Sequence, residues 1–172
     1  MKIRILIVAV LTALFSITCF TQSPTKMVKA FYRFDRSHGQ TFNRRNIDAR
    51  KRWFSRELYN LFLYELKREN EYLKKNPNDK PYFGDGLPFR PYDETCKAAG
   101  RNLHRTFIVK PAFLRGNRAA VTASFPFPRP CKDNDAPTYT IGLIKQGSTW
   151  VIDDLNYGDD RTLKDDLKRK EY

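Results

Sequence analysis

The spacing of apolar residues changes near the middle of this 172-residue chain, and that change limits the fold more than any other feature. From Pro24 to Lys75 apolar side chains recur every three or four residues, which is the period of an amphipathic helix. From Thr106 to Leu155 β-branched and aromatic residues alternate with polar or small ones, which is typical of strands with one buried face. The order predicts an α+β fold in which N-terminal helices pack on a curved four-stranded antiparallel sheet.

Capping residues and apolar spacing predict helices over residues 24–36, 46–54 and 56–75. Ser23 can cap free N–H groups while Pro24 occupies the first turn, and Asn46 is the expected cap of the second helix. The third helix is the longest, and its apolar face is wide. We therefore expect the third helix to lie across the sheet.

Four strands are predicted over residues 106–114, 119–127, 138–145 and 148–155. Gly116-Asn117 and Gln146-Gly147 fall where tight hairpin turns are needed, so each pair of strands should be antiparallel. A short C-terminal helix is expected to begin near Thr162, because Asp165 and Asp166 suit the positive end of a helix dipole.

Residues 76–96 are rich in Pro and Gly and are expected to form a long loop. Cys96 at its end and Cys131 in the loop 126–137 are predicted to form a disulfide. Such a bridge would stabilise the fold by about 3 to 4 kcal/mol in the chain-entropy model. Two buried free thiols remain the alternative, and a metal site is disfavoured because neither Cys has a C-x-x-C partner or a His at ligand spacing.

The first 21 residues have the pattern of a secretory signal peptide, with Lys2 and Arg4 before an apolar run from Ile5 to Phe15. Cleavage is expected after Thr21, which leaves one domain over residues 22–172 in the periplasm or outside the cell. The apolar run is shorter than the ~20 residues of a membrane-spanning helix, so no transmembrane span is predicted.

A lipid anchor on Cys19 is the less favoured form of the exported protein. A lipoprotein signal prefers an aliphatic residue three positions before the cysteine and Gly, Ala or Ser directly before it. Ser16 and Thr18 occupy those positions here.

The formal net charge of +13 favours anionic partners. Removal of residues 1–21 takes away two basic residues and no acid, which leaves +11. In an exported protein this charge favours an anionic envelope polymer and makes nucleic acid an unexpected partner. Most of the basic residues lie among acids and aromatics and are interpreted as solvated faces.

Two short motifs near the C-terminus resemble the end of an exported bacterial family, domain of unknown function 3828. They are W-V-I-D-D-L-x-Y over residues 150–157 and L-K-x-x-L over residues 163–167. Residues 27–32 and 53–58 are similar to the early helices of the same family. The resemblance implies a cone-shaped fold of the nuclear transport factor 2-like (cystatin-like) type, and it implies no reaction, cofactor or catalytic residue.

Few residues point to catalysis. Asp153 and Asp154 are adjacent on a predicted strand, so their side chains should point to opposite faces and not share one site. The chain has two histidines, His38 and His104, and it lacks G-x-S-x-G, H-E-x-x-H and phosphate-binding glycine patterns. We expect no cofactor or metal and favour no enzymatic activity, with a small hydrolase or isomerase that uses an interior Asp with Tyr157 or His104 as the alternative.

Aromatic residues make up 14% of the chain and are the remaining functional signal. Tyr32, Trp53, Asp153 and Tyr157 are predicted to line a ligand pocket, although core packing would explain the aromatic residues equally well. The predicted function is a non-catalytic binding module, with a small ligand in the cone or an envelope protein on the sheet. An inhibitor or immunity-type protein that binds a toxin or hydrolase is an alternative, and homodimerisation is left open.

Overall fold

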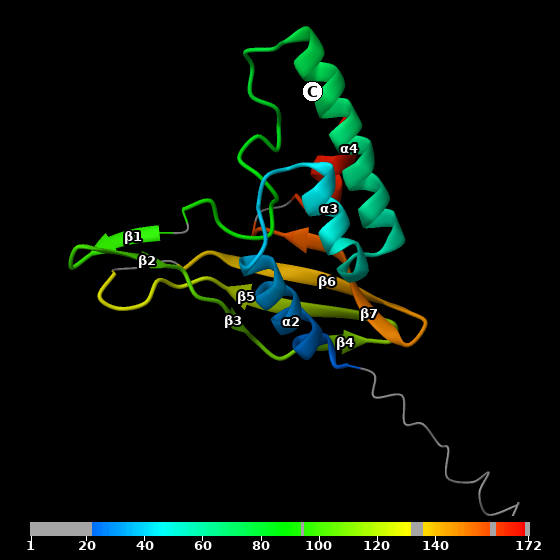
Figure 1. Cartoon of the computed structure of the whole chain (residues 1–172). Helices are drawn as coiled ribbons and strands as arrows, with labels where there is room; N and C mark the ends of the chain where they lie inside the picture. Colours follow the sequence, from blue (N-terminus) through cyan, green and yellow to red (C-terminus); the bar gives the residue numbers. More distant parts are fainter. Residues whose placement is uncertain (1–21, 94, 132–135, 159–160, 171–172) are drawn as a thin grey trace, which may run out of the picture.

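The structure is a computed structural model that describes residues 22–170 apart from 94, 132–135 and 159–160. The predicted signal peptide and Cys19 lie outside these residues. The described helices are α2 (Pro24–Arg36), α3 (Arg44–Arg50), the 3₁₀ turn η2 (Lys51–Trp53), α4 (Arg56–Lys75) and α5 (Leu163–Lys168). The strands are β1 (Thr95–Ala98), β2 (Arg101–His104), β3 (Ile108–Val109), β4 (Phe113–Arg115), β5 (Arg118–Ser124), β6 (Thr138–Gln146) and β7 (Thr149–Asn156). The α+β class is confirmed (Figure 1).

Helix starts follow the capping chemistry of the sequence. Ser55 Oγ accepts a hydrogen bond from the Leu58 amide at 3.1 Å, and α4 has the predicted bounds. The cap predicted for the second helix is wrong. Asn43 Oδ1 accepts from the Asn46 amide at 2.9 Å, so Asn46 is already inside α3.

The main sheet has five described strands because the first predicted strand is interrupted. β3 and β4 both pair antiparallel with β5, and the order continues through β6 to β7. Pro111 lies between β3 and β4 and has no N–H to donate to the ladder. The next amide, of Ala112, donates instead to Thr25 Oγ1 on α2 at 3.0 Å.

A separate two-stranded hairpin, β1–β2, overlaps the end of the expected loop and continues through residues 97–104, for which no element was predicted. Ala99 and Gly100 form its turn with φ of 49° and 73°, the backbone conformation that suits the twist of a two-residue hairpin. The polar strand residues Lys97, Arg101 and Asn102 gave no apolar alternation from which to predict it.

The sheet is covered by α2 and not by the long helix, so the predicted placement of α4 is wrong. α2 contacts β3, β5 and β7, whereas α4 meets the sheet chiefly at β7. There the Ser55 amide donates to the Ile152 carbonyl at 2.7 Å, and α4 then rises away from the sheet (Figure 1). The space between the layers is filled by buried aromatic side chains, which include Phe31, Phe54, Phe62, Phe89 and Phe125. The interior is a packed core.

Candidate functional site

The four residues predicted to line a ligand pocket do not meet in one cavity. Tyr32 and Tyr157 line different cavities, and Asp153 lines a third. Trp53 is a packing residue, with its ring 6.0 Å from the ring of Phe31. Tyr32 alone belongs to the site described next.

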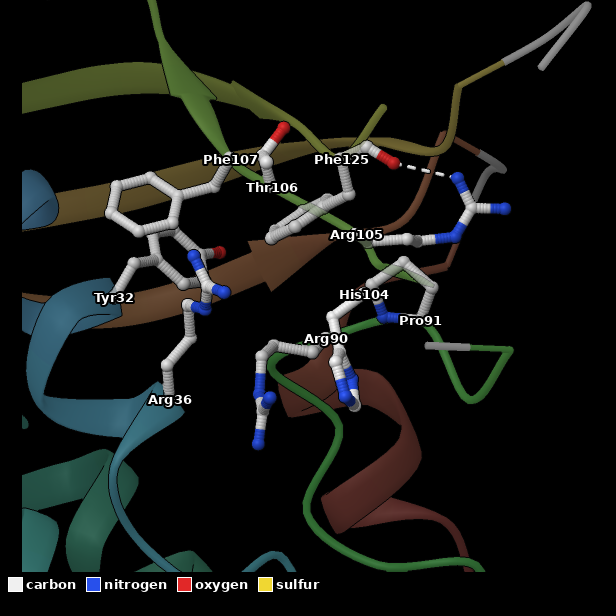
Figure 2. Close-up of a pocket in the computed structure, with 9 residues that line it drawn as sticks. All are labelled: Tyr32, Arg36, Arg90, Pro91, His104, Arg105, Thr106, Phe107 and Phe125. Carbon is white, nitrogen blue, oxygen red and sulfur yellow. Dashed lines mark hydrogen bonds between the residues drawn. The ribbon is translucent and has the colours of Figure 1, made fainter. Parts of the chain in front are cut away.

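This site is a cavity of about 310 Å³ between α2, the segment before β1, and the chain that leads from β2 to β3. We call it the Tyr32 pocket (Figure 2). It is lined by Tyr32, Arg36, Arg90, Pro91, His104, Arg105, Thr106, Phe107 and Phe125. Its described lining thus combines basic and aromatic side chains and contains no carboxylate.

Helix α2 supplies two lining residues from one face. Tyr32 and Arg36 are four residues apart, so their side chains lie one turn from each other along the helix. Both project from α2 toward the cavity in Figure 2. The Tyr32 ring is held by Phe107 at 5.6 Å and by Phe125 at 5.2 Å between ring centroids.

The Tyr32 hydroxyl is the unusual group of the pocket. The residue is fully buried, and its hydroxyl has no hydrogen-bond partner among the described residues. A buried polar group without a partner costs about 1 to 3 kcal/mol, so an orphan in a native fold requires an explanation. Burial, followed by the charge of Asp35 and the neighbouring Tyr139, raises the pKa of Tyr32 well above its usual value, while Arg90 opposes the shift. The hydroxyl therefore stays protonated and can donate.

A buried ion network lies behind the pocket and fixes Arg90. Asp35 binds Arg50 Nε at 2.7 Å through one oxygen and Arg90 Nε at 2.8 Å through the other. Gln40 satisfies the network when its amide oxygen faces the two guanidinium groups, since it then accepts from Arg90 at 2.6 Å and from Arg50 at 2.9 Å. Arg50 also donates to the Gly39 carbonyl at 3.1 Å.

The network leaves an excess of positive charge at the pocket. One carboxylate, that of Asp35, faces two guanidinium groups, so the trio carries a formal charge of one positive unit. Arg36 adds a second cation and forms no ion pair with a described residue. Guanidinium groups suit planar oxyanions because their N–H donors match two oxygens at once.

The aliphatic part of the Arg105 side chain lines the cavity, whereas its guanidinium group points away from the cavity (Figure 2). Its guanidinium donates to the Phe125 carbonyl at 2.6 Å and to the Asp93 carboxylate at 2.7 Å. It also lies 3.7 Å from the centre of the Phe127 ring. Arg105 therefore ties the pocket wall to the segment before β1.

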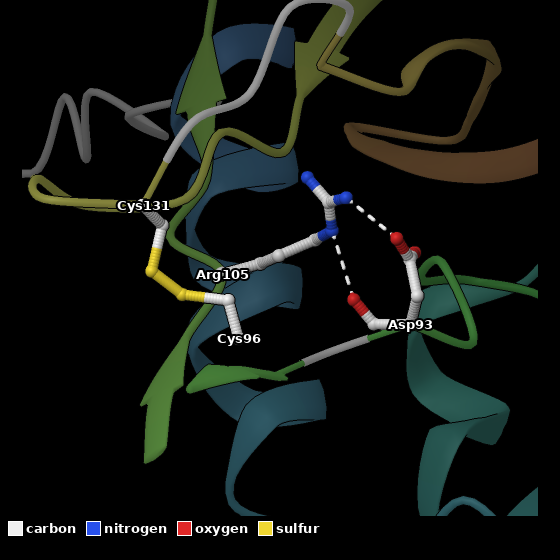
Figure 3. The surroundings of a disulfide bond; sticks show 4 residues. All are labelled: Asp93, Cys96, Arg105 and Cys131. Atoms are coloured by element: carbon white, nitrogen blue, oxygen red, sulfur yellow. Dashed lines mark hydrogen bonds and ion pairs between the residues drawn. A yellow bond between two sulfur atoms is a disulfide. The ribbon is translucent and has the colours of Figure 1, made fainter. Parts of the chain in front are cut away.

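Cys96 and Cys131 form a disulfide, and the predicted pairing is confirmed (Figure 3). The two Cα atoms are 6.5 Å apart, within the usual range for a disulfide. The bridge links β1 to the loop after β5, and β1 pairs with β2, whose last residue is His104. The disulfide thus holds the hairpin that supplies one side of the pocket.

The expectation that Asp153 and Asp154 point to opposite faces is wrong. A β-bulge places Asp154 opposite Gly142 and Ile152 opposite Leu143, so Asp153 is an extra residue in β7. Both aspartates line the same cavity and both bind Lys164 at the start of α5. Asp153 Oδ1 lies 2.9 Å from Lys164 Nζ, and Asp154 Oδ1 accepts from the Lys164 amide at 3.0 Å. The pair docks a helix and lies outside the Tyr32 pocket.

Sequence reasoning identified one of the residues that matter most at this site. Tyr32 was predicted from its aromatic character, whereas Arg36 and Arg90 were not singled out as site residues. His104 was named only as a partner of an interior Asp in the hydrolase alternative. Arg36, Arg90 and His104 come together because residues 86–93 pass the end of α2. This segment forms no helix or strand, so no apolar periodicity in the sequence predicts its path. The one hint in the sequence was a basic residue, Arg90, between the apolar residues Phe89 and Pro91.

Among the described residues, no cluster of three or more His, Cys, Asp or Glu side chains is arranged to hold a metal ion. None of the described helices is long and apolar enough to cross a membrane.

Comparison with known proteins leaves the family open. No family model, no curated protein and no solved structure matches this chain. The resemblance of the motifs at residues 150–157 and 163–167 to domain of unknown function 3828 therefore stays a prediction.

Proposed function

We propose that this protein is an exported, non-catalytic binding module whose Tyr32 pocket takes a small organic acid. The observation that carries the proposal is the fully buried Tyr32 hydroxyl, which has no described partner and lies at a cavity lined by Arg36 and Arg90. A carboxylate placed there would accept from the guanidinium groups, and it would accept from the hydroxyl once ligand entry displaces the side chains that cover it in the free protein. Charge-assisted bonds of this kind are stronger than neutral ones.

The aromatic walls favour an apolar body behind the carboxylate. Phe107 and Phe125 line the cavity beside Tyr32, and they offer ring surface that a simple inorganic anion would not use. The volume of about 310 Å³ is at the small end of the range for ligand cavities, roughly 300 to 1,000 Å³. An aromatic or short aliphatic acid of about the size of phenylacetate fits these limits.

The lining supports binding over catalysis. A general base must reach the substrate, and the described lining holds no carboxylate. His104 is the one lining residue that could act as a base, and its ring has no hydrogen bond to a described residue that would orient it for that role. Two carboxylates bind lining arginines from outside the cavity: Asp35 is fully buried and bound to Arg50 and Arg90, and Asp93 is bound to Arg105. Asp153, the interior acid of the hydrolase alternative, is bound to Lys164 at another cavity.

Export and the nuclear transport factor 2-like fold are further parts of the proposal. The Cys96–Cys131 disulfide supports an oxidising compartment, and the order of helices before an antiparallel sheet supports the fold type. Mass spectrometry of the native exported protein tests export. A chain that begins at Gln22 agrees with it, and an intact chain that begins at Met1 contradicts it.

Thermal unfolding with three probes tests the ligand class. Phenylacetate should raise Tm in a saturable way, whereas phenylacetamide, which has the same ring but no charge, and inorganic phosphate should not. Tyr32→Phe should abolish most of the phenylacetate shift. Tyr59→Phe removes the hydroxyl of another nearly buried tyrosine outside the pocket and should leave the shift intact. Equal shifts with phenylacetamide, or none with phenylacetate, would contradict the proposal.

A further inference from the structure

A second cavity, of about 360 Å³, gathers four tyrosines from separate parts of the chain. We call it the tyrosine pocket. Tyr82 and Tyr92 come from the segment between α4 and β1, Tyr139 from β6, and Tyr157 directly follows β7. The carboxylates of Asp85 and Asp166 lie among them.

The ring of Tyr92 is the surface of this pocket that is most open to a ligand. Tyr92 is 61% exposed, whereas Tyr82 is 43% exposed and has the Arg169 guanidinium 3.6 Å from the centre of its ring. Tyr139 and Tyr157 are half-buried and meet edge to face, with ring centroids 5.4 Å apart. The pocket thus combines two half-buried rings, one exposed ring and one ring on which a guanidinium already stacks.

The hydroxyl groups add unused hydrogen-bonding capacity. The Tyr92, Tyr139 and Tyr157 hydroxyls make no hydrogen bond to a described residue, whereas Tyr82 donates to Asp166 at 2.9 Å. Burial raises the pKa of Tyr139 to about 12, and burial and nearby acids raise the pKa of Tyr157 well above its usual value. These hydroxyls therefore remain protonated at neutral pH and can both donate and accept.

The two carboxylates already have cationic neighbours. Lys80 Nζ lies 2.5 Å from Asp85 Oδ1, and Arg161 lies 3.8 Å from Asp166 Oδ1. Their charges are largely balanced, so the pocket does not require a positive ligand. Their remaining lone pairs can still accept hydrogen bonds from neutral hydroxyl groups.

We infer that the tyrosine pocket binds a saccharide. A pyranose ring presents C–H groups on its faces, which pack on the electron-rich faces of aromatic rings, and it presents hydroxyls at its edge for Tyr and Asp side chains. The exposed ring of Tyr92, the unbonded phenols and the charge-balanced acceptors are the combination that such a ligand uses. The inference does not rest on the organic-acid site, although Arg90 lines both cavities.

Isothermal titration of the folded protein with maltotriose, cellotriose and triacetylchitotriose tests the inference. At least one trisaccharide should bind saturably at one site. Tyr92→Ala should weaken that binding about tenfold, because it removes an exposed ring, while Tyr92→Phe keeps the ring and should stay within about threefold of the wild type.

Tyr64→Ala is the matched control, since Tyr64 on α4 is also 61% exposed and lies outside the pocket. It should bind the trisaccharide as the wild type does. Failure of all three trisaccharides to bind, or equal losses in Tyr64→Ala and Tyr92→Ala, would overturn the inference. Binding of choline in their place would also overturn it, because the pocket would then select a cation.

Discussion

Arg50 Nε donates to Asp35 Oδ1 over 2.7 Å, and neither side chain is exposed to solvent. This pair joins α3 to α2, and the second oxygen of Asp35 holds Arg90 at the pocket. A buried charge that loses its partner is strongly destabilising, whereas an exposed pair contributes little.

Arg50→Met should therefore lower the free energy of unfolding by about 3 kcal/mol. Urea denaturation measures the change. Arg44→Met is the matched control, since Arg44 forms an exposed pair with Asp48 and should cost less than about 1 kcal/mol. Equal losses in the two variants would show that the buried network does not stabilise the fold in this way.

Tyr32→Phe should leave the stability of the ligand-free protein unchanged or slightly higher. The substitution removes a buried hydroxyl that has no described partner, so no hydrogen bond is lost. Denaturation without ligand measures the effect, and Tyr59→Phe, which breaks the bond to Asp48 at 2.7 Å, is the comparison. A loss of more than about 1 kcal/mol in Tyr32→Phe would mean that the hydroxyl is satisfied in the free protein.

Acid should weaken the contact between α4 and α5. Hydrogen bonds from Lys164 and Lys168 lower the pKa of Glu57 to about 2 from its usual 4.5. Because the folded-state pKa is the lower one, the stabilisation is complete above about pH 4.5 and is lost as the pH falls toward 2. The Glu57 side chain is 53% exposed, so the contribution should be about 1 kcal/mol or less.

Glu57→Gln should remove that part of the pH dependence, as measured by urea denaturation between pH 2 and pH 6. Glu71→Gln removes another exposed acid of α4, whose pair with Lys67 is 3.8 Å long, and should change the profile less. Identical profiles for the wild type and Glu57→Gln would contradict the assignment.

Loss of the disulfide should destabilise the protein and weaken ligand binding together. The bridge spans 35 residues, for which the chain-entropy model gives roughly 4 kcal/mol. Cys96→Ala with Cys131→Ala should lower Tm and also reduce phenylacetate affinity, because the hairpin that carries His104 loses its link to the loop. Unchanged affinity in the folded double variant would show that the bridge does not support the pocket.

The sequence allowed good predictions where local chemistry decides the structure. The bounds of α4 follow from the Ser55 cap and from apolar spacing over five turns, and those signals depend on no distant residue. The disulfide followed from the count of cysteines and the compartment. The interruption at Pro111 was also readable in principle, since proline cannot donate to a strand ladder.

Features that depend on tertiary arrangement could not be predicted. The bulge at Asp153 places the Asp153 and Asp154 side chains at the same cavity, where a regular strand would separate them. Nothing in the surrounding sequence distinguishes this bulged segment from a regular strand. Arg90 joins the candidate site only because Asp35 and Gln40 anchor it from elements that precede it by about 50 residues. Tyr32 was thus predicted as a site residue, whereas the two cations beside it, Arg36 and Arg90, were not.

Titration calorimetry with phenylacetate on the wild type, Arg36→Gln and Arg33→Gln tests the binding of an organic acid most directly. Both substitutions remove one positive charge from an exposed position on α2, but only Arg36 lines the Tyr32 pocket. The wild type and Arg33→Gln should bind one equivalent with similar affinity, and Arg36→Gln should bind about tenfold more weakly. An absence of saturable binding to the wild type, or equal losses in the two variants, would contradict the account.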